Sequence, residues 1–307
     1  KPIIQSLQPI QIMTMNLQNV INPHQSRIFK GCLAGAACLL ASATLSAETL
    51  VYDGFGSYAQ DSDLAGQGGG TGWTSNWQLA LGSTPNYFGG SGSIAPDTLD
   101  AEDGYMYTTG VSNTSLGREY GSAVVPTGET EMWFSFAFNR GGPKKFGVNP
   151  LSNSTNFEAG QFLGIRSEND STDVVARIRY AGSSGVDDSS AFTMDGSTDY
   201  FIYGQAVFGS GSTTLNVWIL ERTADLTLLT GAEPATLTVT STSFDSSDQD
   251  SLDAFAIGSG ASVSPSLDEI RIGTSFGDVV TVIPEPSSYA LLGGTLVLGL
   301  AMARRRK

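Results

Sequence analysis

The chain has 307 residues and carries 16 Lys and Arg against 30 Asp and Glu, which gives a net charge of −14. This acidic balance argues against nucleic acid as a partner, because phosphate contacts need positive side chains. Both cysteines, Cys32 and Cys38, and the one histidine, His24, lie near the N-terminus. The rest of the sequence therefore excludes Ser-His-Asp and Cys-His catalytic systems, zinc sites built from His or Cys, and disulfides.

Residues 1–47 are interpreted as an uncertain start followed by a secretory signal peptide. Residues 1–12 precede the first methionine and are left out of the fold prediction. Arg27 and Lys30 come next, and the apolar stretch GCLAGAACLLASATLSA follows them and ends in small residues. This order is typical of a signal peptide, so we expect the Sec export machinery to be a partner.

The signal peptide offers two cleavage positions, after Ala43 or after Ala47, and the sequence does not decide between them. A lipoprotein signal with Cys38 as the acylated residue is the alternative. It is the weaker prediction, because Gly35 lies three residues before Cys38, where a larger aliphatic residue is usual.

Residues 48–280 are predicted to form one β-sandwich domain. In EMWFSFAFN (131–139), apolar side chains recur at every second position, whereas Glu131, Trp133 and Ser135 take the other face. A period of two predicts a half-buried strand rather than a helix. The apolar face of this strand consists of Met132, Phe134, Phe136 and Phe138.

The same alternation recurs along the rest of the domain, in segments 173–181, 201–209, 213–221, 235–244, 253–260 and 268–276. Clusters of Gly, Ser, Asn and Asp, such as GSGS at 209–212, separate these segments and supply hairpin turns. Many short strands with turn signals and no convincing helix predict an all-β fold, an antiparallel β-sandwich or jelly roll.

Four tryptophans offer flat apolar surfaces on which sugar rings can stack: Trp73, Trp77, Trp133 and Trp218. Trp133 and Trp218 are the predicted ligand-binding residues, because each lies on the strand face opposite the main apolar set. The alternative is that a two-sheet fold buries both. The glycine-rich segment GQGGGTGWTSNW (66–77) lacks the lysine and the spacing of a phosphate loop, so it is interpreted as a structural loop.

The segment DSSDQDSLD (245–253) is a candidate calcium site, because oxygen-rich loops bind calcium. Its ligands would be Asp245, Asp248, Asp250 and Asp253. The spacing, glycine and terminal glutamate of an EF-hand are missing, and a solvated loop is the alternative. No other cofactor is predicted. The close-spaced Glu-x-Asp-x-x-Glu pattern of jelly-roll glycosidases is also missing, which argues against catalysis.

Residues 281–307 combine a break, an uncharged run and a basic end. The break is the triplet Pro284, Glu285 and Pro286, since proline lacks an N–H and restricts the residue before it. Tyr289 to Ala303 carries no charge, and Arg304, Arg305 and Arg306 follow at once. As a helix this run would measure about 22 Å, short of a hydrocarbon core of about 30 Å. The run therefore predicts a transmembrane helix that stays in the membrane only transiently, with its basic end in the cytoplasm. An ordinary buried helix is the alternative.

This C-terminal segment resembles the PEP-CTERM sorting signal of exported bacterial surface proteins. The resemblance rests on the order of three features: the residues Val282 to Ser287, the apolar run, and the arginines 304 to 306. It implies that the protein passes transiently through the inner membrane and is cleaved near the triplet by an exosortase, a membrane cysteine protease-transpeptidase.

The domain resembles the concanavalin and laminin-G (LamG-like) jelly rolls, a resemblance carried by segments 50–78, 162–168, 199–220 and 266–280. It implies the fold and little about function. The sequence as a whole predicts an exported cell-surface or extracellular-matrix protein whose domain binds extracellular polysaccharide without catalysis. The alternatives are a secreted polysaccharide-active enzyme, either a glycoside hydrolase or a lyase, and a purely structural matrix component.

Overall fold

The computed structural model describes residues 49–81, 87–108, 114–121, 130–142, 145–153, 160–167, 171–180, 185–259 and 264–282. The chain divides into two compact units, Lys1–Ser46 and Ala47–Lys307, and all of the described residues belong to the second. The predicted signal helix and the predicted transmembrane run 289–303 lie outside the described residues. Within the described ranges, no helix is long and apolar enough to cross a bilayer.

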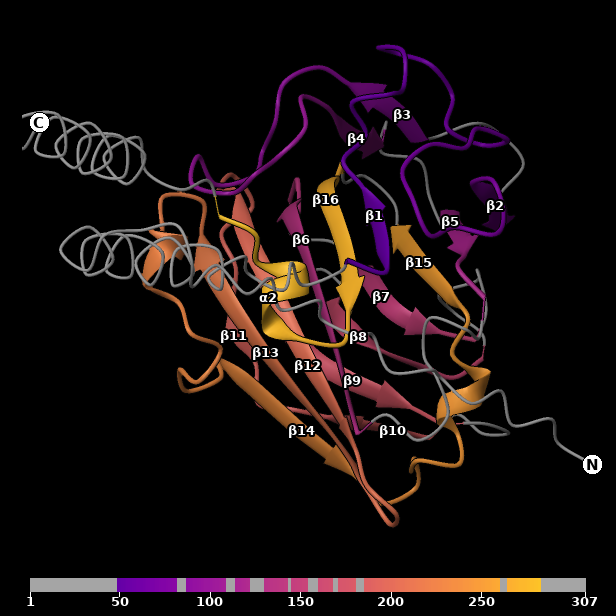
Figure 1. The fold of residues 1–307 in the computed structure, drawn as a ribbon, viewed down its shortest axis with the longest axis vertical. Coiled ribbons are helices and arrows are strands. Elements are labelled where there is room, and N and C mark those ends of the chain that lie inside the picture. The colour runs from indigo at the N-terminus through magenta and orange to yellow at the C-terminus, as the bar shows by residue number, and fades with distance from the viewer. Residues whose placement is uncertain are drawn as a thin grey trace, which may run out of the picture. The chain divides into compact units, whose positions relative to one another are not determined.

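The domain is a sandwich of two antiparallel sheets, which Figure 1 shows as two layers. Sheet A has the strand order β14-β13-β12-β6-β16-β4-β3, and β1 also pairs with β16. Its strands are β1 (Val51–Asp53), β3 (Tyr87–Gly90), β4 (Tyr105–Thr108), β6 (Glu131–Asn139), β12 (Tyr200–Phe208), β13 (Thr213–Glu221), β14 (Leu237–Ser241) and β16 (Ser266–Gly273). The predicted all-β sandwich is confirmed.

Sheet B has the strand order β10-β9-β8-β7-β15-β5-β2, and β11 also pairs with β9. Its strands are β2 (Gln78–Leu81), β5 (Thr114–Glu119), β7 (Phe146–Ser152), β8 (Phe162–Ser167), β9 (Asp173–Arg179), β10 (Val186–Asp188), β11 (Phe192–Thr193) and β15 (Ala254–Ser259). The helical elements of the described residues are short: η1 (Leu226–Leu228), η2 (Gln249–Ser251) and α2 (Phe276–Val279).

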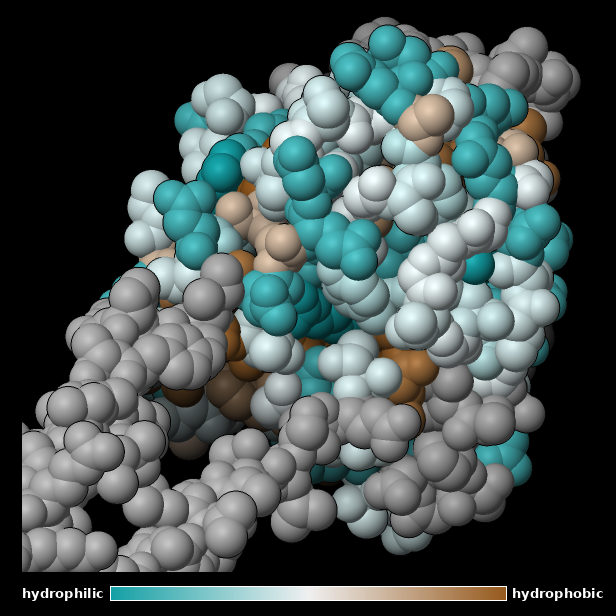
Figure 2. Space-filling view, turned by 45° about the horizontal axis from the view of Figure 1, so that its top comes forward, coloured by the Kyte–Doolittle hydropathy of each residue, from teal (hydrophilic) through white to brown (hydrophobic). Residues whose placement is uncertain are grey.

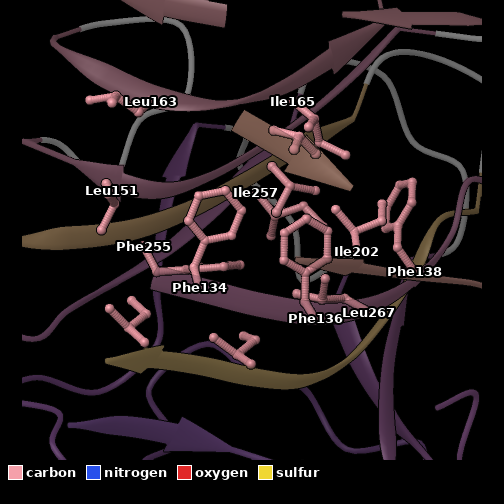
Figure 3. Packing of buried hydrophobic residues seen from close by; sticks show 14 of the residues in the cluster. Phe134, Phe136, Phe138, Leu151, Leu163, Ile165, Ile202, Phe255, Ile257 and Leu267 are labelled. Atoms are coloured by element: carbon pink, nitrogen blue, oxygen red, sulfur yellow. The ribbon is translucent and has the colours of Figure 1, made fainter. Parts of the chain in front are cut away.

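Apolar side chains are concentrated between the two sheets. On the face shown in Figure 2, hydrophilic residues predominate and apolar ones appear in small separate areas. Figure 3 shows the interior, where Phe134, Phe136 and Phe138 of β6 lie opposite side chains of sheet B such as Ile165 and Ile257. All five are fully buried, which confirms the predicted apolar face of β6. Each such side chain contributes about 1.5–3 kcal/mol through burial.

The outer face of sheet A is covered as well. Trp133 and Ser135 of β6 are buried, although the alternating pattern placed them on the polar face of the strand. Val279 of α2 and Leu99 join Trp133 in a second apolar cluster, and the Ser135 hydroxyl donates to the Val279 carbonyl at 2.7 Å. A local period of two does not predict this cover, because the covering residues come from distant parts of the chain.

Strand β16 carries three buried charged residues where its pairing with β6 is irregular. The register shifts between Asp268 and Arg271, and Glu269 has a left-handed φ of 53°. Asp268 accepts hydrogen bonds from the Ser93 hydroxyl at 2.7 Å and from the Ile94 backbone N–H at 3.1 Å. Arg271 and Glu269 form an ion pair at 2.7 Å. These contacts fasten the segment that follows β3 onto sheet A.

We predict that the stability of the domain falls as the pH rises from about 4 to about 8. Burial, with a smaller contribution from Glu269, raises the pKa of Asp268 to about 8, while hydrogen bonds from Ser93 and Ile94 oppose the shift. Because the pKa is higher in the folded state than in the unfolded state, folding takes up a proton in this interval. The resulting stabilisation is complete below the unfolded pKa and is lost as the pH rises through the folded pKa.

Thermal denaturation at a series of pH values between these limits measures the effect. Asp268→Asn places an uncharged amide at this position, so the pH dependence of its melting temperature should be flatter than that of the wild type. An equal slope in the variant and the wild type would show that Asp268 is not the titrating group.

Candidate functional site

A polar groove of about 560 Å³ opens beside the glycine-rich segment. The described residues that line it are Gly68, Gly69, Gly70, Trp73, Thr74, Ser75, Asn76 and Arg118. Its volume lies within the range of small-molecule sites, about 300–1,000 Å³. The lining is mostly polar, which suits a ligand that carries many hydrogen-bonding groups.

The glycine-rich wall of the groove is fixed by pairing with β1. The Tyr52 N–H donates to the Thr71 carbonyl at 3.0 Å, and the Thr71 N–H donates to the Tyr52 carbonyl at 2.8 Å. Gly70 has a φ of 63°, and a Cβ at this position would lie 2.0 Å from the Tyr52 carbonyl oxygen. Only glycine fits there. The segment interpreted as a structural loop is therefore a rigid wall.

The floor of the groove is formed by Arg118 from β5, whose side chain is only 5% exposed. Its Nη1 forms an ion pair with the Asp53 carboxylate at 2.9 Å, and its Nε donates to the Ser75 carbonyl at 2.7 Å. The same Asp53 oxygen accepts from the Tyr58 hydroxyl at 2.8 Å and from Trp77 Nε1 at 3.1 Å. Burial raises the pKa of Asp53, and these partners oppose the shift. Arg118 is thus held in one orientation.

Two polar groups on the groove are free to meet a ligand. Among the described residues, none accepts a hydrogen bond from Arg118 Nη2. Asn76 donates its Nδ2 to the Gly66 carbonyl at 2.8 Å, which leaves its Oδ1 as an open acceptor within the described part of the chain. A Cβ on Gly68 would lie 2.5 Å from Asn76 Oδ1 and 3.4 Å from Arg118 Nη2. Asn76 Oδ1 and Arg118 Nη2 therefore both lie beside Gly68, and Asn76 Oδ1 occupies the space that a side chain at this position would need.

Trp73 is the tryptophan that lines this groove. The guanidinium carbon of Arg118 lies 4.7 Å from the centroid of its ring, a cation–π contact. The ring also packs against Trp77 at a centroid distance of 5.7 Å, and its Nε1 donates to the Tyr52 carbonyl at 3.0 Å. Because the guanidinium lies over one face of Trp73, that face is not free to stack on a sugar.

The exposed surface predicted at Trp133 and Trp218 is not found, because these residues are only 5% and 6% exposed. They do lie on the outer face of sheet A, where their rings stack at a centroid distance of 5.9 Å. Phe276 of α2 packs edge-on against Trp133 at 5.6 Å, and Trp218 Nε1 donates to the Glu233 carbonyl at 2.8 Å. The alternative, burial by the fold, is what the structure shows.

The carboxylates predicted to bind calcium lie around η2 and do not converge. Asp245 accepts from the Ser247 hydroxyl at 2.7 Å, and Asp248 accepts from Gln161 Nε2 at 2.8 Å. Burial raises the pKa of Asp253. Across the described ranges, no three Asp, Glu, His or Cys side chains are grouped so that they could hold a metal ion. The calcium site predicted at Asp245, Asp248, Asp250 and Asp253 has no support from this geometry.

The predicted sorting residues, Pro284 to Pro286 and Arg304 to Arg306, lie outside the described residues. Val282 is the last described residue, and it forms an antiparallel bridge with Leu99. The sorting signal therefore stays a prediction.

Sequence reasoning missed the pair at the centre of the groove, Asp53 and Arg118. They are 65 positions apart in the chain, and neither belongs to a recognisable motif. One signal was present: Arg118 has the same parity in β5 as Leu116, whose side chain faces the core. A charged residue on the apolar face of a strand needs a buried partner, which is a reason to look for one.

No protein-family model matches the sequence, and no curated protein matches it significantly. The fold is similar to several solved structures. A protein of unknown function from Shewanella oneidensis MR-1 shares 16% identity at a TM-score of 0.38, and the match covers 84% of this chain and 95% of that one.

Two further solved structures are a GH131 beta-glucanase catalytic domain from Podospora anserina and the carbohydrate-binding module CBM66 from Bacillus subtilis. The first shares 12% identity at a TM-score of 0.46, over 76% of this chain and 98% of that domain. The second shares 7% identity at a TM-score of 0.36, over 70% of this chain and 99% of that module. At these scores and identities, the similarities carry no information on what this chain binds.

We predict that Trp218→Ala destabilises the domain by about 3–5 kcal/mol, because the truncation leaves a cavity under the residues that cover sheet A. Urea denaturation measures the change. Leu228→Ala is the matched control: Leu228 is 75% exposed, so its truncation should change the free energy of unfolding by less than about 0.5 kcal/mol. Equal urea midpoints for Trp218→Ala and the wild type would mean that the ring is not part of a packed layer.

Proposed function

We propose that the chain is an exported cell-surface or extracellular-matrix protein that binds polysaccharide through the polar groove. The observation that carries this proposal is the pair of free groups beside Gly68, the Nη2 of Arg118 and the Oδ1 of Asn76. Sugar hydroxyls both donate and accept hydrogen bonds, so a single sugar ring can satisfy a donor and an acceptor at once.

The rigidity of the groove supports this proposal. Thr71 pairs with β1, and Asp53 and Ser75 hold Arg118. Binding groups that are already fixed lose little conformational freedom when a ligand arrives, so more of the contact energy appears as affinity. The hydroxyl-bearing residues Thr74 and Ser75 also line the groove.

The composition of the groove favours binding over catalysis. Glycoside hydrolysis generally requires two carboxylates on either side of the scissile bond. The described lining residues include no Asp, Glu or His, and the nearest buried carboxylate, Asp53, is paired with Arg118 below the surface. A glycoside hydrolase or lyase would need its acid and base elsewhere in the molecule, so we propose a non-catalytic module.

We predict that Gly68→Ala lowers the affinity for a bound polysaccharide about tenfold or more, a loss of roughly 1.4 kcal/mol. The added methyl would lie 2.5 Å from Asn76 Oδ1 and would displace this acceptor, at a position where the backbone φ does not require glycine. A glycan array identifies the polymer, and calorimetry compares the variants.

The matched control for this substitution is Gly211→Ala, because a Cβ on Gly211 meets no atom within 4 Å. This control should bind like the wild type. If Gly68→Ala also binds like the wild type, the polysaccharide contacts a different part of the protein.

We further propose that the C-terminal tail is a sorting signal, read in the membrane and then removed by an exosortase. Two prolines at 284 and 286 would favour an extended, accessible backbone, and the short apolar run with the arginines that follow would set the depth of the chain in the membrane. Cleavage at the triplet would remove nothing from the described sandwich, which extends to Val282.

In a host that has the sorting enzyme, we predict that the surface form lacks Arg304 to Lys307, as intact mass will show. Alanine substitution of Pro284, Glu285 and Pro286 should leave an uncut, membrane-retained form, because the recognition triplet is lost. A wild-type surface protein that still carries the basic tail would make the segment a plain anchor.

A further inference from the structure

The groove also indicates which class of sugar it accepts. We infer that it selects an uncharged sugar unit with two neighbouring free hydroxyls. One hydroxyl donates to Asn76 Oδ1, and the other accepts from Arg118 Nη2. This inference rests on the proposed function and specifies the ligand of the same groove.

The two polar groups beside Gly68 are held in fixed positions. Asn76 cannot turn freely, because its Nδ2 is bonded to the Gly66 carbonyl, and this fixes the direction of its Oδ1. Arg118 is fixed through its Nε and Nη1, so its planar guanidinium also fixes Nη2, which lies 3.4 Å from the Cβ position of Gly68. Hydroxyls on adjacent ring carbons are close enough to meet a donor and an acceptor that both lie beside Gly68.

The groove offers no unpaired positive charge among its described residues. Asp53 lies 2.9 Å from Arg118, and both side chains are buried, so the cation under the groove is already neutralised. The described lining residues include no lysine and no other arginine. The neighbouring Glu119 is exposed and adds a negative charge nearby. A carboxylated sugar would therefore find no unpaired positive charge to offset the loss of its hydration.

Two of the three guanidinium nitrogens of Arg118 are already hydrogen-bonded within the protein. A carboxylate binds arginine most strongly through two parallel N–H bonds from different nitrogens. In Arg118, Nε is committed to the Ser75 carbonyl and Nη1 to Asp53 and the Tyr58 hydroxyl. Only Nη2 remains, so a carboxylate could not form the parallel pair of bonds that makes it the preferred partner of arginine. The arginine therefore does not select for acidic sugars in this setting.

Calorimetry with matched polymers tests the inference on the full-length protein, processed as it occurs in its host. The neutral 1,4-linked probes are mannan, xylan and a soluble glucan, whose units keep two adjacent ring hydroxyls. Polymannuronate is the acidic counterpart of mannan, with a carboxylate in place of the C6 hydroxymethyl group. A 1,3-linked glucan is the third class, because its linkage occupies the hydroxyl between the other two.

We expect at least one neutral 1,4-linked polymer to bind, about tenfold or more tighter than polymannuronate and the 1,3-linked glucan. Its affinity should change less than about twofold with added salt, since no net charge is paired. Periodate cleaves the carbon–carbon bond between two adjacent hydroxyls, oxidising both carbons to aldehydes while it is reduced to iodate. After borohydride reduction, the treated polymer should have lost its binding.

Asn76→Ala should weaken the binding of the neutral polymer about two- to tenfold, the weight of one lost hydrogen bond. Asn216→Ala, which removes an amide on the outer face of sheet A, is the matched control and should leave the affinity unchanged. Tighter binding of polymannuronate, equal binding of the 1,3-linked glucan, or binding that survives periodate would overturn the inference and leave polysaccharide binding intact. Failure to bind any polymer in the panel or the array would overturn the proposed function itself.

Discussion

The buried ion pair between Asp53 and Arg118 is the point where the two sheets and the groove meet. Asp53 ends β1 in sheet A, and Arg118 belongs to β5 in sheet B, so their 2.9 Å contact joins the two layers. Removing one partner would leave an unpaired buried charge, which typically costs about 3–5 kcal/mol. Because the same contact holds the floor of the groove, losing this link between the sheets would also disturb the shape of the site.

β1 has only three residues, yet it connects three parts of the structure. The backbone of Tyr52 pairs with Thr71 in the wall of the groove, and its hydroxyl donates to Glu269 in the buried charge cluster of β16. The next residue, Asp53, holds Arg118. A displacement of β1 would therefore disturb the wall, the floor and the carboxylates of β16 together. The proposed binding site is thus connected through β1 to the buried charge cluster of β16.

The sequence predicted the strands that alternate clearly and missed several that do not, including β7, which has seven residues and lies in the middle of sheet B. The segments predicted at 131–139 and 213–221 coincide with β6 and β13, because their alternation spans whole strands. β1 and β3 were not predicted as strands either, since each is only three or four residues long; β1 pairs with the distant β16, and β3 pairs with the next strand, β4. The fold class followed from the repeated pattern, which needs no knowledge of the pairing.

The site was beyond the reach of the sequence for the same physical reason. The stacking face predicted for Trp133 follows from strand parity alone. Parity does not tell which residues cover that face, and in the structure Phe276 and Val279 cover it. The groove likewise depends on which distant residues come together: residues 68 and 76 line the same groove as residue 118. Composition did anticipate part of it, since a glycine-rich loop permits the close approach that Gly70 makes to β1.

The positions of the first and last described residues bear on how such a domain tolerates processing. Thr49 donates through its hydroxyl to the Asp278 carbonyl at 2.6 Å, and Val282 bridges to Leu99, so the sandwich holds both ends of the described chain. Both candidate signal cleavage sites, after Ala43 or Ala47, precede Thr49, and the Pro-Glu-Pro triplet follows Val282. Cuts at these places would leave every hydrogen bond between the two ends in the mature protein. Removal of the proposed export and sorting segments would then keep all of the described contacts that hold the groove in shape.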